Sequence, residues 1–329
     1  MWLGFGCGDD DSQRGTVDDP STDGDADSDG DGDSDSDGDA DGDSDGDADS
    51  DGDSDSDSDP VEGDTEYDPV GSDGRQGFST KYWDCCKAHC AWPENVSSGQ
   101  DPAPVCDINN NPTDPVIDQG TWLQGKPSGC DDPYNADAVF TCWNQSPWAV
   151  SDTLSYGFVA THAGGEFSCG QCFQFDFDGQ SRQTLESDYG VIDDGSASLE
   201  GKTMIVQVTN IGYDVTQVAN AYQFDIMIPG GGVGAFNGCS AQWGVDNSQL
   251  GATYGGFLQA CYDMYGFNES HSTYKSCVEE MCNDVFSPAG MEDLLAGCLW
   301  YVNWMNVADN PAFKYKQVTC PDVLTSRGM

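Results

Sequence analysis

Residues 78–93 read FSTKYWDCCKAHCAWP and place a single aspartate, Asp84, among cysteines and aromatic rings. Two cysteines follow Asp84 directly, and a third, Cys90, comes four positions after the second. Cross-links this close to a carboxylate would fix its backbone, and catalysis is sensitive to small displacements of a reacting group. The stretch therefore predicts a disulfide-rich fold that holds one carboxylate rigidly beside ring surfaces. The alternative for Asp84 is a simple turn cap.

The cysteines indicate how the fold is stabilised. The chain has 15 of them, and all except Cys7 lie between Cys85 and Cys320. The 14 that remain predict up to seven disulfides and an oxidising compartment outside the cytoplasm. Cys169 and Cys172 have zinc-like spacing, but there is no second such pair and the chain has only 3 histidines. We therefore expect no structural metal. The sequence does not give the pairing of the cysteines.

The charge of the chain excludes some partners. The net charge is −48 over 329 residues, and both the N-terminal 76 residues and the remainder are acidic. Nucleic-acid binding needs clustered Lys and Arg, so we expect no nucleic-acid partner. An anionic membrane surface is disfavoured for the same reason. A neutral polymer or cations suit this surface better.

The N-terminal part has a repeating acidic composition. From Asp23 to Asp59 every odd position is aspartate, separated by Gly, Ser and Ala. Such a segment has no apolar face to bury, and its charges repel one another. We therefore predict a disordered tether over residues 9–76. DSDGDG resembles the start of a calcium loop, but the closing Glu is absent, so we expect only loose cation association. A calcium-binding adhesin with an inert barrel is the corresponding alternative function.

The first eight residues resemble a processing site. Cys7 follows a small residue and precedes several acids, as in a bacterial lipoprotein, although the positive and apolar regions of a full signal are missing. We interpret residues 1–8 as the remnant of a lipoprotein signal, with a lipid on Cys7 as the one link to a membrane. The alternative is that Cys7 is an incidental thiol. The chain has no apolar run long enough for a transmembrane helix.

Residues 77–329 have the composition of a globular domain. Alternation of apolar and polar residues predicts strands at 172–177, 202–212 and 313–321, and 222–239 reads as a strand followed by a glycine-rich loop. That loop lacks the spacing of a phosphate-binding motif. Residues 290–304 begin like a helix and pass into a β-like aromatic run. Short strands with many cysteines predict a mainly β, closed structure with helices in its connections.

Four stretches, in order, resemble glycoside hydrolase family 45, a family of small disulfide-rich endoglucanases. They are STKYWDCCKAHCAW at 79–92, SPWAVSDTLSYGFVAT at 146–161, FDIMIPGGGVGAFNGC at 224–239 and GCLWYVNWMNVADNPAFKYKQVTCP at 297–321. The chain departs from the family at Lys81, where Arg is usual, and in longer segments near 178–200 and 245–280. The second of these carries Cys261 and Cys277, a candidate additional bridge.

The resemblance implies a fold, a reaction and a set of site residues. The fold would be a six-stranded double-psi β-barrel with an open groove. The reaction would be hydrolysis of internal β-1,4-glucan bonds with inversion and without a cofactor. Asp84 would be the general base, with Asp225 as an auxiliary carboxylate. Three residues would contact the sugar chain: Thr80, Tyr82 and Trp92. Lys87 would bind hydroxyls or keep Asp84 ionised. We expect Trp83 in the core.

Asn237 is the difficulty, because the resemblance places a general-acid aspartate at this position. An amide cannot protonate a leaving alkoxide, and loss of a general acid typically costs about 10²–10⁴-fold in rate. Four explanations stay open. Asp225 serves as the acid, Asp246 is carried there by a loop, deamidation at Asn237-Gly238 restores an aspartate, or catalysis is lost.

The sequence therefore predicts an extracellular, lipid-anchored bacterial endoglucanase, monomeric and acting on β-1,4-glucan. The alternative is a non-hydrolytic, expansin-like protein that binds glucan and loosens walls without cutting.

Overall fold

The computed structural model describes residues 67–118, 123–163, 166–182, 194–212, 215, 217–218, 220–287 and 290–329. The predicted lipoprotein remnant and the acidic repeat lie outside the described residues. The folded unit begins before the predicted boundary at residue 77, because the chain is already packed at Tyr67. The Tyr67 hydroxyl lies 3.2 Å from that of Tyr156, and the backbone N–H of Val70 donates to Asp176 Oδ2 at 2.6 Å.

The elements alternate between short strands and short helices. The strands are β1 (Arg75–Tyr82), β2 (Val105–Cys106), β3 (Pro112–Thr113), β4 (Val116–Asp118), β5 (Leu123–Gly125), β6 (Trp148–Ala149), β7 (Leu154–His162), β8 (Cys172–Ser181), β9 (Thr203–Gly212), β10 (Gln217–Val218), β11 (Ala221–Met227) and β12 (Pro311–Val318). The α-helices are α2 (Cys239–Trp243), α3 (Gly256–Tyr265), α4 (His271–Phe286), α5 (Glu292–Asn303) and α6 (Asp322–Thr325). Single 3-10 turns are η1 (His89–Ala91), η2 (Pro93–Asn95), η3 (Trp143–Gln145), η4 (Ser196–Leu199) and η5 (Asn247–Gln249).

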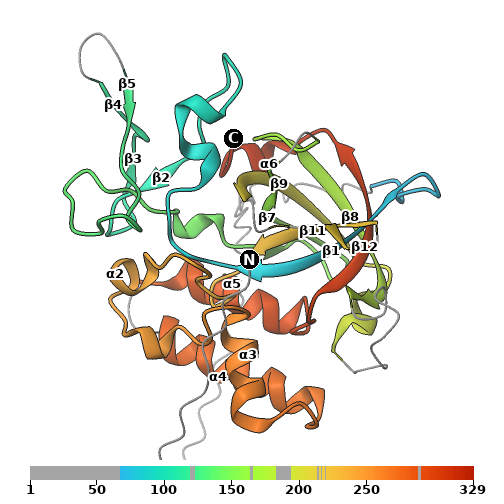
Figure 1. Ribbon diagram of the computed structural model, residues 1–329. Coiled ribbons are helices and arrows are strands. Elements are labelled where there is room, and N and C mark those ends of the chain that lie inside the picture. The colour runs from blue at the N-terminus through green and yellow to red at the C-terminus, as the bar shows by residue number, and fades with distance from the viewer. Residues whose placement is uncertain are drawn as a thin grey trace, which may run out of the picture. The chain divides into compact units, whose positions relative to one another are not determined.

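One sheet organises the described residues. Its eight strands follow the order β10-β11-β1-β12-β8-β9-β7-β6, and β11 also pairs with β7. The strands β11, β1, β12, β8, β9 and β7 therefore form a closed cycle of pairings (Figure 1). Within this cycle, β1 pairs in parallel with β11 and β7 pairs in parallel with β9. The prediction of a mainly β fold is confirmed, and β8, β9, β11 and β12 lie at the predicted strands, although β12 ends at Val318 and not at residue 321.

The sheet encloses an aromatic core. In β8 the alternate residues Phe173, Phe175 and Phe177 are all buried, as the alternation in the sequence predicts. The ring of Phe175 stacks on that of Phe313 with centroids 4.0 Å apart, and Phe224 meets Phe175 edge-on at 4.8 Å. Rings from strands far apart in sequence thus fix the distances between those strands.

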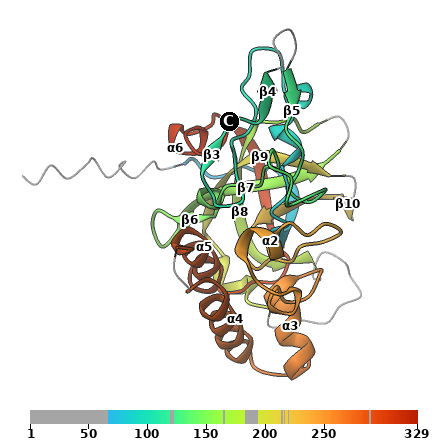
Figure 2. The same ribbon diagram turned by 90° about the vertical axis from the view of Figure 1, so that its left-hand side faces the viewer.

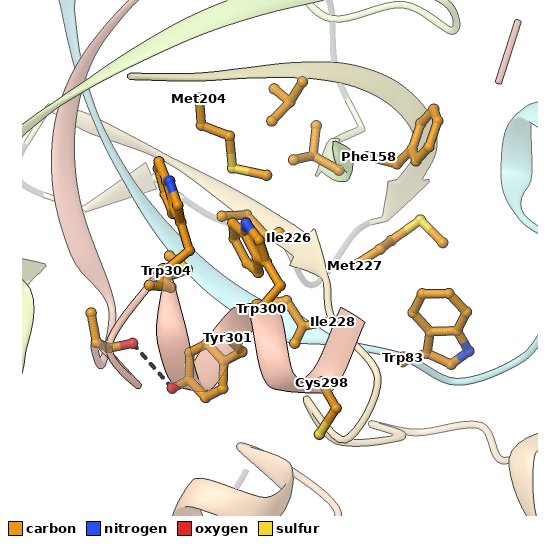
Figure 3. Packing of buried hydrophobic residues seen from close by; sticks show 14 of the residues in the cluster. Trp83, Phe158, Met204, Ile226, Met227, Ile228, Cys298, Trp300, Tyr301 and Trp304 are labelled. Atoms are coloured by element: carbon orange, nitrogen blue, oxygen red, sulfur yellow. Dashed lines mark hydrogen bonds between the residues drawn. The ribbon is translucent and has the colours of Figure 1, made fainter. Parts of the chain in front are cut away.

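The helices α2 to α5 gather on one side of the sheet, and the β4–β5 hairpin projects from the opposite side (Figures 1 and 2). The helical start predicted within 290–304 is confirmed, but the predicted β-like continuation is wrong, because α5 stays helical to Asn303. Trp300 of α5 stacks on Trp304, which follows the helix directly, with centroids 5.4 Å apart, and the Tyr301 hydroxyl donates to the carbonyl of Ala308 at 3.1 Å (Figure 3). No described helix is long and apolar enough to cross a bilayer.

Seven disulfides join the described residues, which confirms the predicted number. The pairs are Cys85–Cys239, Cys86–Cys130, Cys90–Cys169, Cys106–Cys142, Cys172–Cys320, Cys261–Cys277 and Cys282–Cys298. The additional bridge predicted in the long segment links α3 to α4.

Candidate active site

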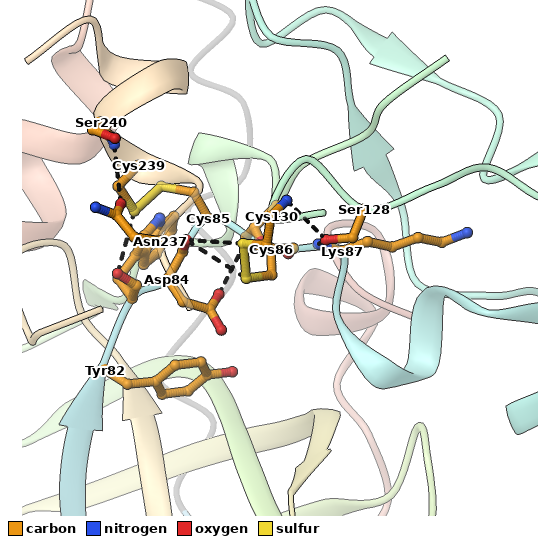
Figure 4. The surroundings of a disulfide bond; sticks show 12 residues. Tyr82, Asp84, Cys85, Cys86, Lys87, Ser128, Cys130, Asn237, Cys239 and Ser240 are labelled. Carbon is orange, nitrogen blue, oxygen red and sulfur yellow. Dashed lines mark hydrogen bonds between the residues drawn. A yellow bond between two sulfur atoms is a disulfide. The ribbon is translucent and has the colours of Figure 1, made fainter. Parts of the chain in front are cut away.

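Asp84 lies two residues beyond the end of β1, in a segment that is tied on both sides. Its Oδ1 accepts a hydrogen bond from the backbone N–H of Cys86 at 2.9 Å, and its carbonyl accepts from the N–H of Gly238 at 2.9 Å. The next two residues are both cross-linked, Cys85 to Cys239 and Cys86 to Cys130 (Figure 4). The carboxylate is therefore fixed through its backbone, as the sequence predicts.

The backbone at Cys85 is strained. Its φ is +62°, a left-handed conformation that costs a non-glycine residue about 1–2 kcal/mol. Such a conformation persists only where the surrounding structure enforces it. The two disulfides and the contacts of Asp84 supply that constraint, and the sharp turn aims the half-buried Asp84 side chain to the side of Tyr82 (Figure 4).

Asp225 reaches the same region from β11. The parallel pairing of β1 with β11 sets Thr80 opposite Asp225. The Thr80 hydroxyl donates to Asp225 Oδ1, and Gln223 Nε2 donates to the same oxygen at 2.7 Å. Two donors on one oxygen fix the orientation of this carboxyl group. Thr80 therefore positions a carboxylate, in addition to the sugar contact predicted for it.

Both carboxylates line one cavity, which we name the central hollow. It has a volume of about 340 Å³, and Tyr82, Asp84 and Asp225 are among its lining residues. A second cavity of about 400 Å³, the glycine-loop hollow, is lined by Thr80, Gly232 and Tyr254 and shares Tyr82, Asp225 and Gly234 with the first. The central hollow thus continues past Asp225 along the protein.

A third cavity lies on the other side of the central hollow. This hairpin hollow has a volume of about 360 Å³ and is lined by Trp92 and by residues of the β4–β5 hairpin, including Ile117 and Gly125. It shares Asp131 with the central hollow. Three neighbouring cavities with shared walls form a trough, and the two carboxylates lie at its centre. A trough of this kind suits an extended chain.

Comparison with known proteins agrees with this geometry. Residues 76–266 match the model of the glycosyl hydrolase family 45. The chain belongs to family 45. It is 49% identical over 254 residues to "Endoglucanase B" of Cellvibrio japonicus (strain Ueda107), a match that spans 77% of this chain and 45% of that relative. It is 34% identical to "Endoglucanase" of Cryptopygus antarcticus, over 76% of this chain and 87% of the relative.

A solved structure shows the same fold. The crystal structure of a cellulase from the Antarctic springtail Cryptopygus antarcticus aligns with a TM-score of 0.53 and 34% identity, over 78% of this chain and 96% of the other. This family 45 chain therefore shares its fold with that structure over most of its length.

The aromatic residues of the 78–93 stretch take different positions in the family 45 chain. Trp83 is 1% exposed, which confirms the prediction that it belongs to the core. Tyr82 lines both the central and the glycine-loop hollow, and its hydroxyl accepts from Asn210 Nδ2 at 3.2 Å. Trp92 is partly exposed in the hairpin hollow. Tyr82 and Trp92 thus both line cavities of the trough, and their contact with a sugar ring stays a prediction.

The Lys87 ammonium is hydrogen-bonded on the side away from Asp84. It donates to the carbonyls of Pro115 and Lys126, each at 2.9 Å, and the Lys87 side chain runs away from Asp84 (Figure 4). Burial lowers the pKa of Lys87 to about 8. The charge of Lys87 is thus held at the wall of the hairpin hollow, and its predicted support of the ionisation of Asp84 stays a prediction. A direct contact with sugar hydroxyls stays a prediction.

Asn237 is turned away from the reacting region. Its Nδ2 donates to Asn247 Oδ1 at 2.9 Å and its Oδ1 accepts from the N–H of Ser240 at 3.1 Å (Figure 4). It is not among the residues that line the central hollow. The exposed Asp246 is also engaged elsewhere, because its side chain caps η5 in a reciprocal pair with Gln249. Neither residue faces Asp84 across the trough.

Several lining residues escaped the sequence analysis. Gln223 lies two positions before Asp225 on the same strand, and this period of two was an available signal. His89 and Asn210 also line the central hollow, and the backbone N–H of His89 donates to Asn210 Oδ1 at 2.8 Å. Burial lowers the pKa of His89. Among the described residues no group of three or more potential ligands is arranged to hold a metal ion.

Proposed function

We propose that this family 45 chain is an endo-β-1,4-glucanase that hydrolyses internal bonds of cellulose or related β-glucans with inversion. The observation that carries the proposal is that Asp84 and Asp225 line the same hollow at the centre of a trough. The printed names of the relatives, endoglucanases and a cellulase, support the same substrate class. The acidic chain is also suited to an uncharged polymer.

In the proposed mechanism Asp225 is the general acid and Asp84 the general base. Asp225 gives its proton to the glycosidic oxygen as the bond from that oxygen to the anomeric carbon breaks. A water molecule attacks the anomeric carbon from the opposite face, and Asp84 takes the proton of that water. Inverting enzymes keep the two carboxyl groups about 6.5–9.5 Å apart so that the water fits between them. The tied backbone of Asp84 suits a base whose position is fixed, and the two donors on Asp225 Oδ1 set the orientation of the second carboxyl group.

This assignment leaves no catalytic role for Asn237. With Asp225 as the acid, neither deamidation of Asn237 nor movement of Asp246 is needed to complete the mechanism. The hydrogen bonds of Asn237 to Asn247 and Ser240 instead connect the segment after the glycine-rich loop to α2 and η5. We therefore propose a structural role for Asn237.

The test compares reducing-end release from barley β-glucan by four proteins. The wild type should cut, Asp84→Asn and Asp225→Asn should each lose about 10²–10⁴-fold in kcat, and Asn237→Asp should gain little. If the wild type releases no reducing ends and Asn237→Asp does, Asp225 is not the general acid. Position 237 would then be the place of the acid. A silent wild type that still binds β-glucan would support the alternative of a non-hydrolytic binder.

The stereochemistry has a separate test. Inversion at a β-linked bond releases the α-anomer first, and proton NMR recorded during the first minutes of cleavage distinguishes it from the β-anomer. Initial release of the β-anomer would refute the inverting mechanism.

We also propose finer features of the fold and a location. The closed cycle of six strand pairings supports a double-psi β-barrel. The seven disulfides support an extracellular location. We keep the proposals of a lipid on Cys7 and of a monomer. Mass spectrometry of the mature N-terminus and sedimentation analysis would test these two.

A further inference from the structure

A buried cation connects the segment of Asp84 to the wall of the hairpin hollow. Lys87 is 5% exposed, and its Nζ donates to the carbonyls of Pro115 and Lys126 at 2.9 Å each. These two residues flank the β4–β5 hairpin, and the N–H of Lys126 donates to the same Pro115 carbonyl at 2.9 Å. The ammonium therefore links the two residues at the base of the hairpin through hydrogen bonds.

The same ammonium lies against an aromatic ring of the hairpin hollow. Lys87 Nζ is 3.8 Å from the centre of the Trp92 ring, a close cation–π distance. The ring is also packed against the hairpin backbone, because a Cβ placed on Gly125 would lie 2.6 Å from Trp92 Cε3. Trp92 is thus held between the cation and the strand β5. Its position depends on both.

We propose that Lys87 is a positioning residue, whose ammonium holds Trp92 and the β4–β5 hairpin as the distal wall of the trough. The inference rests on the proposed function, since it assigns a role in binding the glucan chain. The central hollow contains the reacting carboxylates, and the hairpin hollow lies beyond Asp131. A short substrate occupies the central hollow alone, whereas a longer one also reaches Trp92. Lys87 therefore sets how strongly cleavage depends on chain length.

The charge on Lys87 can be titrated. Burial lowers its pKa to about 8, with Glu94 acting to raise the pKa and Lys126 to lower it. Asp131 also lines both hollows. Above pH 8 the neutral amine loses its attraction to the ring and to the carbonyls. Because the pKa is depressed on folding, this group makes the fold more stable as the pH rises from 8 towards its unfolded value. Loss of long-chain binding at alkaline pH would therefore not reflect unfolding through Lys87.

The experiment measures kcat/KM for cellotetraose and cellohexaose with the wild type, Lys87→Met and Lys126→Met. Lys126 is the matched control, because its ammonium donates to Thr113 Oγ1 at 2.9 Å and not to the two carbonyls that Lys87 holds. The ratio of cellohexaose to cellotetraose should fall about tenfold in Lys87→Met and stay unchanged in Lys126→Met. In the wild type the ratio should also fall as the pH rises past about 8. This pH dependence should be absent in Lys87→Met.

A Trp92→Ala variant completes the design. In that background Lys87→Met should add little, because the ring it positions is gone. The inference is overturned if the ratio of kcat/KM for cellohexaose to that for cellotetraose is unchanged in Lys87→Met. If Lys87→Met does not fold, the wild type gives the test, and a ratio that stays constant across pH 8 overturns the inference. Should the wild type bind without cutting, the proposed function fails, and calorimetric affinities for the two oligosaccharides test the same ratio. A wild type that neither cuts nor binds overturns both.

Discussion

The disulfide between Cys86 and Cys130 should matter for catalysis beyond its effect on stability. It closes a loop with a sequence separation of 44, for which the chain-entropy model gives about 4 kcal/mol at 25 °C. Replacing both cysteines with alanine should lower Tm by about 8–16 °C in a domain of this size. The same change frees the backbone next to Asp84. Displacements of about 1 Å cost up to about 100-fold in rate, so we expect kcat to fall about 10- to 100-fold.

A second disulfide supplies the control. Cys261–Cys277 has a sequence separation of 16, which corresponds to about 3 kcal/mol, and it joins α3 to α4. Neither of its cysteines lines the central hollow. Its removal should lower Tm by about 6–12 °C while kcat stays near that of the wild type.

The assay is reducing-end release from barley β-glucan at a temperature at which near-ultraviolet circular dichroism shows all three proteins folded. Equal kcat values for the two double-alanine variants would refute the reasoning, because stability alone would then explain the role of the cross-links around Asp84.

Three further predictions concern single residues. Gly238→Ala places a Cβ 3.1 Å from Cys130 Sγ and 3.3 Å from the carbonyl oxygen of Cys85, next to Asp84, and should lower kcat about tenfold with little change in Tm, measured on the same β-glucan. Thr80→Val removes a donor to Asp225 and should lower kcat/KM about tenfold; Thr80→Ser should recover most of it, and failure of the serine to do so would point to packing. Phe175→Ala empties a fully buried site in the core and should cost about 3–5 kcal/mol of unfolding free energy in a denaturant titration.

The sequence predicted those parts of the fold that are encoded locally. The alternation at 172–177 and the apolar residues of 202–212 mark strands that the fold buries, and an even set of cysteines implies bridges. The pairing of the bridges did not follow, because Cys85 meets Cys239 across a separation of 154. The helix α5 was read as partly β from its aromatic content. Trp300 and Trp304 are four residues apart, and their stacking at the end of the helix shows that this spacing carried the better signal.

The candidate site was also predicted only in part, because only part of it is encoded by neighbouring residues. Asp84 is marked by its neighbours in the chain, whereas the importance of Asp225 depends on the parallel pairing of β11 with β1. Asn237 drew attention because of its motif, but its side chain interacts with Asn247 and Ser240. The direction of Lys87 could not be predicted either, because its partners Pro115 and Lys126 lie about 30 and 40 residues further along the chain.

The way the chain enters the fold has a mechanical consequence. Residues 67–70 contact β8 and β12 before β1 begins: Lys316 Nζ donates to the carbonyl of Asp68 at 2.8 Å, and Val70 bonds to Asp176. A pull applied upstream of Tyr67 would first load these contacts, and β1, which leads to Asp84, would bear tension only after they had broken. If the protein were attached through the residues before Tyr67 and pulled by bound polymer, these contacts would keep Asp84 in position under that force.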